Sequence, residues 1–278
     1  MSLTVIVTGA TSGLGAQATR ALAAAGHRVI MACRDPARAR SVASTIKGDL
    51  EVRAIDLADL TSVHAFATHL DEEVDVLINN AGVMGVPRGT TADGFELHLG
   101  VNHLGPFALT ALIINRIRGR VVTVTSGLHH LGRLPADLSL PLRRYHRWPA
   151  YSRSKLANLL FAYELQRRLA ASGRRTISVA AHPGVTATEG QRRDTSLQGK
   201  LLAGGRAQPP EMGALPLLYA ATAPDITGGT LIGPDGFLQR NGHPAVVRSS
   251  RRSHDPALAT RLWNFSEHAT GVRYPPLV

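Results

Sequence analysis

The stretch Thr8–Gly15, TGATSGLG, joins a short apolar run that begins at Leu3 to an alanine-rich segment typical of a helix. A glycine-rich turn between a strand and a helix suits a phosphate, because free N–H groups at the helix N-terminus point at the anion. Gly9 allows the tight turn, Gly13 lets the backbone approach a pyrophosphate, and Gly15 permits close helix–strand packing. Glycine spacing alone is a weak signal, but at a first strand–helix turn it predicts a dinucleotide-binding site. The alternative is a structural turn that binds nothing.

Apolar runs rich in valine and isoleucine alternate with helix-like segments along the chain. We expect strands at 3–8, 28–32, 51–55, 74–78, 119–125, 176–181 and 230–232. We expect helices at 13–25, 36–47, 60–70, 93–117, 150–171 and around 256–267. Alternation with continuously apolar strands predicts a parallel sheet covered on both faces. The expected fold class is therefore α/β, a three-layer αβα Rossmann fold with a doubly wound parallel sheet of about seven strands.

A single dinucleotide-binding domain is predicted for residues 1–278, because neither a linker nor a composition break interrupts residues 1–240. Residues 186–212 lack clear periodicity and are predicted to form a substrate lid. Residues 240–278 form a C-terminal extension that we expect to pack on the same domain.

Composition narrows the class of protein. A hydrophobic content of 44% with 18% charged residues fits a globular core. The sequence shows neither an apolar stretch of about 20 residues nor a signal-peptide pattern, so no membrane span is expected. Cys33 is the only cysteine, which excludes an internal disulfide and favours a cytoplasmic location. The net charge of +11 comes from scattered arginines without a nucleic-acid motif, so we expect it to attract anionic cofactors and not nucleic acid.

The end of the second predicted strand bears on which dinucleotide binds. A carboxylate there would contact the free 2′-hydroxyl of NAD, whereas an arginine fork suits the 2′-phosphate of NADP. Arg34 follows this strand directly, so we favour NADP(H) over NAD(H). Asp35 keeps NAD(H) open as the less favoured cofactor. It is also open that Arg34 is a solvated charge and that Asp35 caps the helix beginning at Pro36.

Tyr151 and Lys155 lie one helical turn apart, so their side chains share a face. A phenol has a pKa of about 10, and a neighbouring ammonium lowers it, which makes the pair a candidate general acid/base. Alone, the pair is a weak signal. Ser126 ends one predicted strand and Asn79–Gly82 follows another, at the edge where carboxyl ends of parallel strands line a ligand crevice. Asn102 lies in the predicted helix between them.

These motifs resemble those of the short-chain dehydrogenase/reductase family. Thr8–Gly15 fits its TGxxxGxG motif, Asn79–Gly82 its NNAG motif and Tyr151–Lys155 its YxxxK motif. The motifs occur in the family's order and cover roughly residues 3–190. The resemblance implies one catalytic set: Asn102, Ser126, Tyr151 and Lys155.

The resemblance also implies cofactor contacts beyond the glycine turn. Asp56-Leu57 resembles the pair beside the adenine, and His182–Thr186 resembles the segment on the nicotinamide side. The implied cofactor-binding residues are Gly9, Thr11, Ser12, Gly13, Leu14, Gly15, Arg34, Asp56, Leu57, Asn80, Ala81, Gly82, Tyr151, Lys155, Pro183, Gly184, Val185 and Thr186. The spacing of cysteine, histidine and carboxylate residues suggests no metal site.

Gly233–Gly236 and Trp263–Glu267 resemble bacterial members of the retinol dehydrogenase and protochlorophyllide reductase branch. Three further segments narrow the resemblance to that branch. These segments are Val101–Phe107, Ser126–His130 and Tyr151–Asn158. The gap of 25 positions from Ser126 to Tyr151 exceeds the family's usual dozen or so, as it does in that branch. A lone cysteine argues against light-driven protochlorophyllide reduction, because the cysteine set expected of that enzyme is missing.

The resemblance implies an NADPH-dependent carbonyl reductase or alcohol dehydrogenase. Tyr151 would give its proton to the developing alkoxide, while Lys155 would lower the phenol pKa and hold the nicotinamide ribose. Ser126 would polarise the carbonyl, and Asn102 would position a water that links Lys155 to solvent. The cofactor carries the hydride, and the protein supplies orientation and electrostatics.

The substrate pocket is expected from residues 128–149, from 186–212 and from the C-terminal segment. These segments hold apolar and aromatic side chains: Leu128, Leu131, Leu134, Leu138, Leu140, Leu142, Tyr145, Trp148, Leu201 and Leu202. They predict a bulky lipophilic ketone or aldehyde, or the matching alcohol, as in secondary metabolism. The alternative is that the leucines only pack the insertion. His129 and His130 are either substrate contacts or ordinary loop residues.

Two rival functions use the same fold. A non-catalytic NADP-binding regulatory or scaffold protein typically loses the tyrosine or the lysine, and both are present here. An enzyme of epimerisation or dehydration is the other rival. A homodimer built on the helices predicted at 93–117 and 150–171, or a monomer, is expected.

Overall fold

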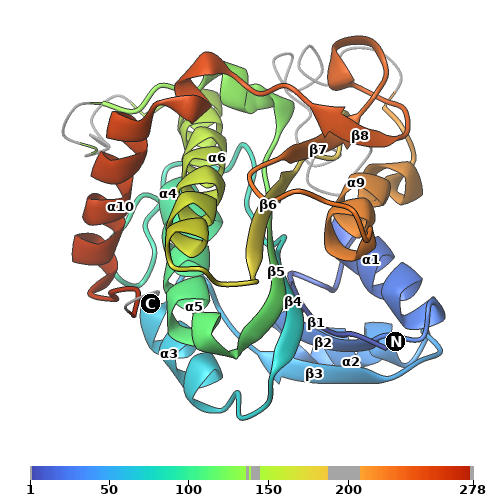
Figure 1. Cartoon of the computed structure of the whole chain (residues 1–278). Coiled ribbons are helices and arrows are strands. Elements are labelled where there is room, and N and C mark those ends of the chain that lie inside the picture. The colour runs from blue at the N-terminus through green and yellow to red at the C-terminus, as the bar shows by residue number, and fades with distance from the viewer. Residues whose placement is uncertain (1, 136–137, 139–144, 187–206, 276–278) are drawn as a thin grey trace.

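The computed structural model describes residues 2–135, 138, 145–186 and 207–275 (Figure 1). Its strands are β1 Thr4–Thr8, β2 Arg28–Cys33, β3 Leu50–Ala54, β4 Val74–Asn79, β5 Ile117–Val124, β6 Ile177–Ala181, β7 Leu231–Pro234 and β8 Pro244–Val247. They form one sheet in the order β3-β2-β1-β4-β5-β6-β7-β8. Neighbours from β3 to β7 pair in parallel, which confirms the predicted α/β fold.

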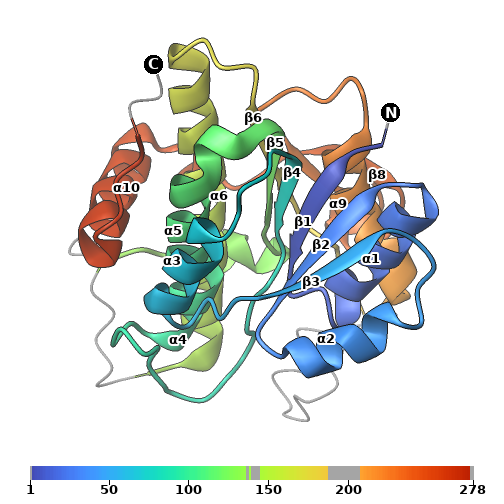
Figure 2. The same ribbon diagram turned by 90° about the horizontal axis from the view of Figure 1, so that it is seen from below.

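The helices cover both faces of this sheet, as Figure 2 shows from below. They are α1 Gly13–Ala24, α2 Pro36–Ala43, α3 Leu60–Thr68, α4 Leu97–Leu99, α5 Gly105–Ile113, α6 Arg147–Ala171, α9 Pro210–Thr222 and α10 Pro256–Thr270. One core cluster joins the sheet to α1, α2 and α9, and another joins it to α3, α5, α6 and α10. The chain therefore folds as the three layers that its alternating pattern predicts.

The eighth strand is a departure from the prediction of about seven. β8 pairs antiparallel with β7, from Leu231 opposite Val247 to Pro234 opposite Pro244. Its four residues begin with a proline and follow a Gly-His pair, so the sequence carries no apolar alternation long enough to indicate a strand. The C-terminal extension continues into α10, whose buried Trp263 packs against Phe107 of α5.

The helix predicted at 93–117 is shorter and less regular in the structure. It begins at Leu97, because the Glu96 carboxylate accepts the N–H groups of His98 and Leu99 as a cap. A π-helical turn, Gly100–Leu104, and a closing 3₁₀ turn flank α5, and the chain enters β5 at Ile117. The stretch Leu97–Arg116 is long and apolar enough to cross a membrane, yet 83% of its most apolar window is buried inside the fold. A core helix of a globular protein has the same composition.

Two other helix boundaries differ from the prediction. α6 begins at Arg147, ahead of the predicted residue 150, and α2 ends at Ala43, ahead of the predicted residue 47. α9 occupies the end of the predicted lid and beyond, a region that the sequence left unassigned. Gly213 and Pro216 lie inside this helix, and both residues weaken a helical signal. Within the predicted lid, residues 187–206 lie outside the described residues.

Candidate functional site

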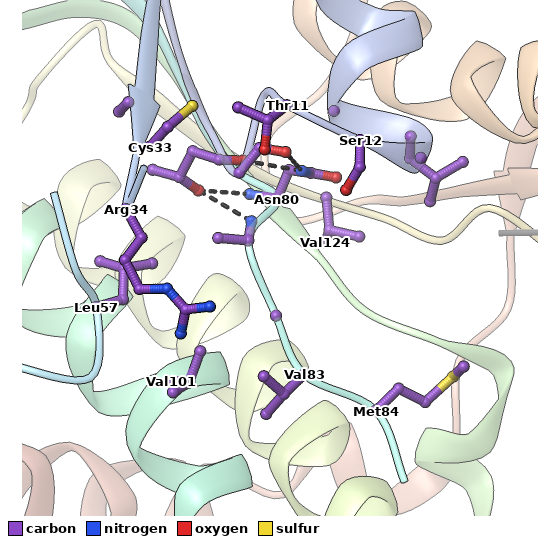
Figure 3. A pocket seen from close by; sticks show the side chains of 18 of the residues that line it. Thr11, Ser12, Cys33, Arg34, Leu57, Asn80, Val83, Met84, Val101 and Val124 are labelled. Carbon is purple, nitrogen blue, oxygen red and sulfur yellow. Dashed lines mark hydrogen bonds between the residues drawn. The ribbon is translucent and has the colours of Figure 1, made fainter. Parts of the chain in front are cut away.

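A cleft of about 460 Å³ lies along the carboxyl edge of the sheet, beyond the ends of β1, β2, β4 and β5 (Figure 3). Of the predicted site residues, its wall includes Gly9, Thr11, Ser12, Gly13, Leu14, Gly15, Arg34, Asp56, Leu57, Asn80, Ala81, Gly82, Tyr151, Lys155 and Pro183. These residues come from the glycine turn, the next two strand ends, the Asn80–Gly82 turn, α6 and the end of β6. The structure therefore brings together at one edge most of what the motifs indicated.

The glycine turn is shaped by close approach to its neighbours. Gly9 has a φ of +68°, and a Cβ there would lie 2.9 Å from the Cα of Ala81. Gly13 also has a positive φ, of +53°. A Cβ on Gly15 would overlap the Gly9 carbonyl oxygen and the Asn80 side-chain amide. The turn thus leaves free N–H groups at the start of α1 without side-chain bulk, which fits a dinucleotide pyrophosphate.

Hydrogen bonds of Thr8 and Asn80 hold the glycine turn against the turn after β4. The Thr8 hydroxyl accepts the backbone N–H groups of Asn80 and Ala81, each at 3.0 Å. The Asn80 Nδ2 donates to the Thr8 carbonyl oxygen at 2.8 Å. Thr8 was not among the predicted contacts, although the motif contains it, because its hydroxyl works through the backbone of the neighbouring strand.

Arg34 and Asp35 lie at the end of β2 and have different environments. The Asp35 carboxylate accepts the backbone N–H of Arg38 at 3.0 Å and so caps α2. This is the alternative role that the sequence left open for Asp35. The exposed Arg34 side chain borders the cleft (Figure 3). Arg38 borders the same end of the cleft, and the sequence reasoning missed it. The sequence could have indicated Arg38, because it lies four positions after Arg34 in the arginine-rich first turn of α2.

Tyr151 lies in the cleft wall and is 7% exposed. Burial raises the pKa of Tyr151 to about 12, and a hydrogen bond with the Ser126 side chain opposes that rise. The Lys155 Nζ donates to the Val124 carbonyl oxygen at 3.1 Å and lies 5.7 Å from the centroid of the Tyr151 ring. Burial lowers the pKa of Lys155 to about 8.

These directions correct one expectation. The sequence argument had the ammonium of Lys155 lowering the phenol pKa of Tyr151, but in the structure burial outweighs every other influence on that phenol. A phenol with a pKa of about 12 stays protonated at neutral pH. In this state Tyr151 is equipped to donate a proton.

Asn102 lies beneath the cleft wall, with 1% of its surface exposed. Its Oδ1 accepts the N–H of Val83 at 2.7 Å, and its Nδ2 donates to the Val83 carbonyl and to the Ser154 hydroxyl, both at 2.9 Å. The side chain therefore ties the turn after β4 to α6. Asn102 lies in the π-helical turn, a local form that is frequent at functional sites.

Gly184, Val185 and Thr186 are not among the residues that line the cleft, and the cofactor contacts that the resemblance implies for them stay predictions. The Val185 N–H donates to the Arg240 carbonyl at 2.7 Å, so this backbone faces the β7–β8 connection. The Thr186 hydroxyl donates to the Pro183 carbonyl at 2.8 Å. Only Pro183 of that segment borders the cleft.

The leucines that were predicted to line a substrate pocket do not share one environment. Leu134 and Leu138 pack in a core cluster with Leu258 and Leu262 of α10, which favours the alternative that they pack the insertion. Leu140, Leu142, Leu201 and Leu202 lie outside the described residues. The Trp148 ring makes an edge contact with Tyr151, with centroids 6.2 Å apart. The apolar side chains that border the cleft include three that were missed: Val83, Met84 and Val101.

Two further polar side chains hold α6 against the end of β5. The Thr125 hydroxyl donates to the Lys155 carbonyl oxygen at 2.8 Å, and the Asn158 Nδ2 donates to the Val124 carbonyl at 2.9 Å. Sequence reasoning missed these positions, because their hydrogen bonds fix the backbone around Lys155. Among the described residues, no group of three or more histidine, cysteine or carboxylate side chains is arranged to hold a metal ion.

Comparison with known proteins identifies the family. A sequence profile of the short chain dehydrogenases matches residues 3–198. The chain belongs to the short-chain dehydrogenase family. Human retinol dehydrogenase 13 is 38% identical over 294 aligned residues, which cover 98% of this chain and 86% of the relative. The predicted family and its retinol dehydrogenase-like branch are thereby confirmed.

Solved structures agree with this assignment to the short-chain dehydrogenases. An uncharacterised protein from Mycobacterium paratuberculosis is 45% identical, with a TM-score of 0.86 over 98% of this chain and 95% of that chain. A proposed NAD(P)-dependent gluconate 5-dehydrogenase from Beutenbergia cavernae, solved with bound NADP at low occupancy, is 27% identical. It has a TM-score of 0.63 over 82% of this chain and 93% of that chain. As a short-chain dehydrogenase, the chain is an NAD(P)-dependent oxidoreductase that uses a nicotinamide cofactor.

Proposed function

We propose that this short-chain dehydrogenase reduces the carbonyl group of a lipophilic ketone or aldehyde, with NADPH as hydride donor and Tyr151 as proton donor. The observation that carries the proposal is the buried, protonated Tyr151 phenol in the cleft wall, hydrogen-bonded to Ser126 and one helical turn from Lys155. A neutral phenol at that place matches an acid that must protonate an alkoxide at neutral pH.

The reaction balances without a further reactant. The nicotinamide supplies a hydride to the carbonyl carbon and leaves oxidised. Tyr151 gives its phenolic proton to the carbonyl oxygen, and its phenolate is reprotonated from solvent. Ser126 would orient the same oxygen through its hydroxyl, because its side chain is close enough to Tyr151 to lower the pKa of that phenol.

Lys155 and Asn102 support this proton transfer. The Lys155 ammonium lies beside the Tyr151 ring, where its charge stabilises the phenolate left after proton donation. Asn102 fixes the turn that ends at Val83 and so keeps Gly82, which borders the cleft, in place. We assign it a positioning role with the water chain to Lys155 that the family resemblance implies.

The preference for NADPH over NADH rests on the end of β2. The Asp35 carboxylate caps α2, which makes it a poor partner for a ribose 2′-hydroxyl. Arg34 and Arg38 border that end of the cleft, where guanidinium groups suit a 2′-phosphate. The remaining cofactor contacts follow the cleft from the glycine turn past Asp56 to Pro183.

The lipophilic substrate class rests on two supports. Val83, Met84 and Val101 give the part of the cleft near the turn after β4 an apolar wall. A relative that is 38% identical to this chain is named retinol dehydrogenase 13, and retinol is a lipophilic alcohol. A non-catalytic regulatory role is disfavoured, because both Tyr151 and Lys155 are in place. Cytoplasmic location, a single domain and the choice between homodimer and monomer stay predictions.

Replacing Tyr151 with Phe tests the proposal. We expect turnover of an aromatic ketone panel, followed by loss of NADPH absorbance, to fall at least about a hundredfold, the usual scale of a general acid. NADPH binding, measured by fluorescence, should persist because the ring remains. Tyr219→Phe is the matched control, since Tyr219 is 42% exposed on α9. Retained turnover in Tyr151→Phe would contradict the proposal.

A further inference from the structure

His129 is the most buried polar side chain on the turn that carries Ser126. It lies in the short 3₁₀ turn Gly127–Leu131 and has no exposed surface. Its ring connects two segments that are 121 positions apart in the sequence, the Ser126 turn and the residues that follow β8. With a partner on each nitrogen, the His129 imidazole has no ring donor or acceptor left for a substrate.

The hydrogen bonds fix the tautomer of this ring. The backbone N–H of Ser250 can only donate, and it points at the Nε2 of His129 from 3.1 Å. Nε2 therefore accepts, and the single proton of the neutral ring lies on Nδ1. Nδ1 donates that proton to the Ser126 carbonyl oxygen at 2.7 Å. The Ser126 carbonyl also accepts the backbone N–H of His129 at 2.9 Å, so two donors hold it.

Burial keeps His129 in this neutral form. It lowers the pKa of His129 to about 4; the hydrogen bond to the Ser126 carbonyl opposes this, and the charges of His130, His182 and His254 add to it. The centroids of the His129 and His130 rings are 4.1 Å apart. The Nδ1 proton and the Nε2 lone pair are therefore both available to their partners at neutral pH.

The far end of the connection is anchored to the helix that carries the proposed acid. The Ser249 hydroxyl, next to Ser250, shares a hydrogen bond of 2.9 Å with the Tyr163 hydroxyl of α6. The Ser253 hydroxyl closes the turn by donating to the Ser250 carbonyl at 2.6 Å. His129 thus completes a frame that starts at Ser126, passes through Ser250 and returns to α6.

His182 repeats this arrangement on the neighbouring strand end. The backbone N–H of Gly184 donates to its Nδ1 at 3.2 Å, so Nε2 carries the proton and donates to the Gln239 Oε1 at 3.0 Å. The Gln239 amide then donates to the Arg248 carbonyl at 2.9 Å. Two buried histidines of set tautomer therefore tie two turns at the carboxyl edge of the sheet to the segment 239–250.

We propose that His129 is a positioning residue that holds Ser126 in register with Tyr151 by hydrogen-bonding Ser126 to Ser250. The residues that follow β8 are thereby a working part of the active site, although none of the described residues from 248 to 275 borders the cofactor cleft. The inference rests on the role proposed for Ser126 in carbonyl reduction.

A double-mutant cycle between His129→Leu and Ser126→Ala tests the inference. With NADPH and the aromatic ketone that the enzyme reduces fastest, His129→Leu should lower kcat about tenfold, the size of one lost hydrogen bond. The KM for NADPH should stay within about twofold, because His129 does not border the cofactor cleft. In the Ser126→Ala background the same change should have almost no further effect on kcat.

The outcomes separate the inference from the proposed function. If His129→Leu lowers kcat by the same factor with and without Ser126, His129 does not act through Ser126 and the inference fails. If Ser126→Ala leaves kcat unchanged, the proposed role of Ser126 fails first. Unchanged kcat in His129→Leu alone also overturns the inference.

Two polar variants and a control complete the experiment. If His129→Leu does not fold, His129→Asn and His129→Gln replace it in the cycle. The amide of Asn lies near the position of Nδ1 and keeps the bond to Ser126, whereas that of Gln reaches the position of Nε2 and keeps the bond to Ser250. Each variant keeps one of the two hydrogen bonds, so each should lower kcat measurably but by less than tenfold. If both variants have the kcat of the parent, the proposal is overturned. His64→Gln, at an exposed histidine of α3, should change kcat less than about twofold.

Discussion

Mild acid should destabilise this protein through three buried histidines. His103, His129 and His182 are each at most 1% exposed. Burial lowers the pKa of His103 to about 3 and that of His129 and His182 to about 4. In the unfolded chain a histidine has a pKa of about 6.5. Between pH 4 and 6.5 the unfolded state therefore binds more protons than the folded state, so the free energy of unfolding falls as the pH falls.

The magnitude follows from the pH distance to the unfolded pKa. At pH 5 the unfolded histidine lies about 1.5 pH units below its pKa, which costs the folded state about 2 kcal/mol for each histidine. Three such residues give about 6 kcal/mol, a large share of the 5–15 kcal/mol typical of a folded domain. Hydrogen bonds outweigh burial and lower the pKa values of the Glu51, Glu96 and Glu164 carboxylates, so their contribution to stability is lost only below about pH 4.5.

Urea unfolding at pH 5 and pH 7, followed by circular dichroism, measures this difference. His129→Asn removes one of the three groups, so its free energy of unfolding should depend on pH by about 2 kcal/mol less than that of the parent. An exposed histidine, as in His64→Asn, should leave the pH dependence unchanged. Equal free energies of unfolding at the two pH values would refute the reasoning.

Three further predictions concern the cofactor cleft. Arg34→Ala should raise the KM for NADPH at least about tenfold more than the KM for NADH, since a guanidinium–phosphate pair contributes on the order of 1.5–3 kcal/mol. Steady-state assays with both cofactors measure this, and equal changes in the two KM values would contradict the assignment. Gly15→Ala should lower the free energy of unfolding by roughly 1–3 kcal/mol and weaken NADPH binding, because its Cβ would overlap Gly9 and Asn80. Gly89→Ala meets only the end of Leu97 at 3.5 Å and serves as its control in thermal unfolding. With the pKa of Lys155 lowered to about 8, kcat/KM for reduction should fall above about pH 8 as the ammonium is lost; a pH–rate profile flat to pH 10 would exclude that role.

The sequence predicts the sheet and the cleft because both depend on short, local signals. Continuously apolar strands and one glycine turn suffice to place Gly9–Gly15, Asn80 and Tyr151 at one edge. The elements that were missed have weak local signals. α9 contains Gly213 and Pro216, and β8 gains its place only by pairing with β7. Such tertiary contacts override the propensities that a sequence displays.

The candidate site shows the same division. The family resemblance predicts Tyr151, Lys155 and Ser126 as catalytic residues, but the pKa of Tyr151 depends on how much water the fold removes around it. The role of His129 was undecidable from sequence, because its partner Ser250 is 121 positions away. Asn102 was expected in a regular helix, and only the structure shows the π-helical turn that directs its side chain at Val83 and Ser154.

The hydrogen bonds to the Pro183 carbonyl oxygen bear on how the length of the chain can differ among related enzymes. It accepts the Thr186 hydroxyl at 2.8 Å and the Gln208 side-chain amide at 2.6 Å, and Thr186 pairs with Gln208 through a parallel bridge. Two residues that are 22 positions apart in the sequence therefore meet at the end of β6. Closing a longer or shorter segment between fixed ends changes the free energy of folding only slowly with length. Relatives can therefore differ in the number of residues between these two positions while Pro183 keeps its place in the cleft wall.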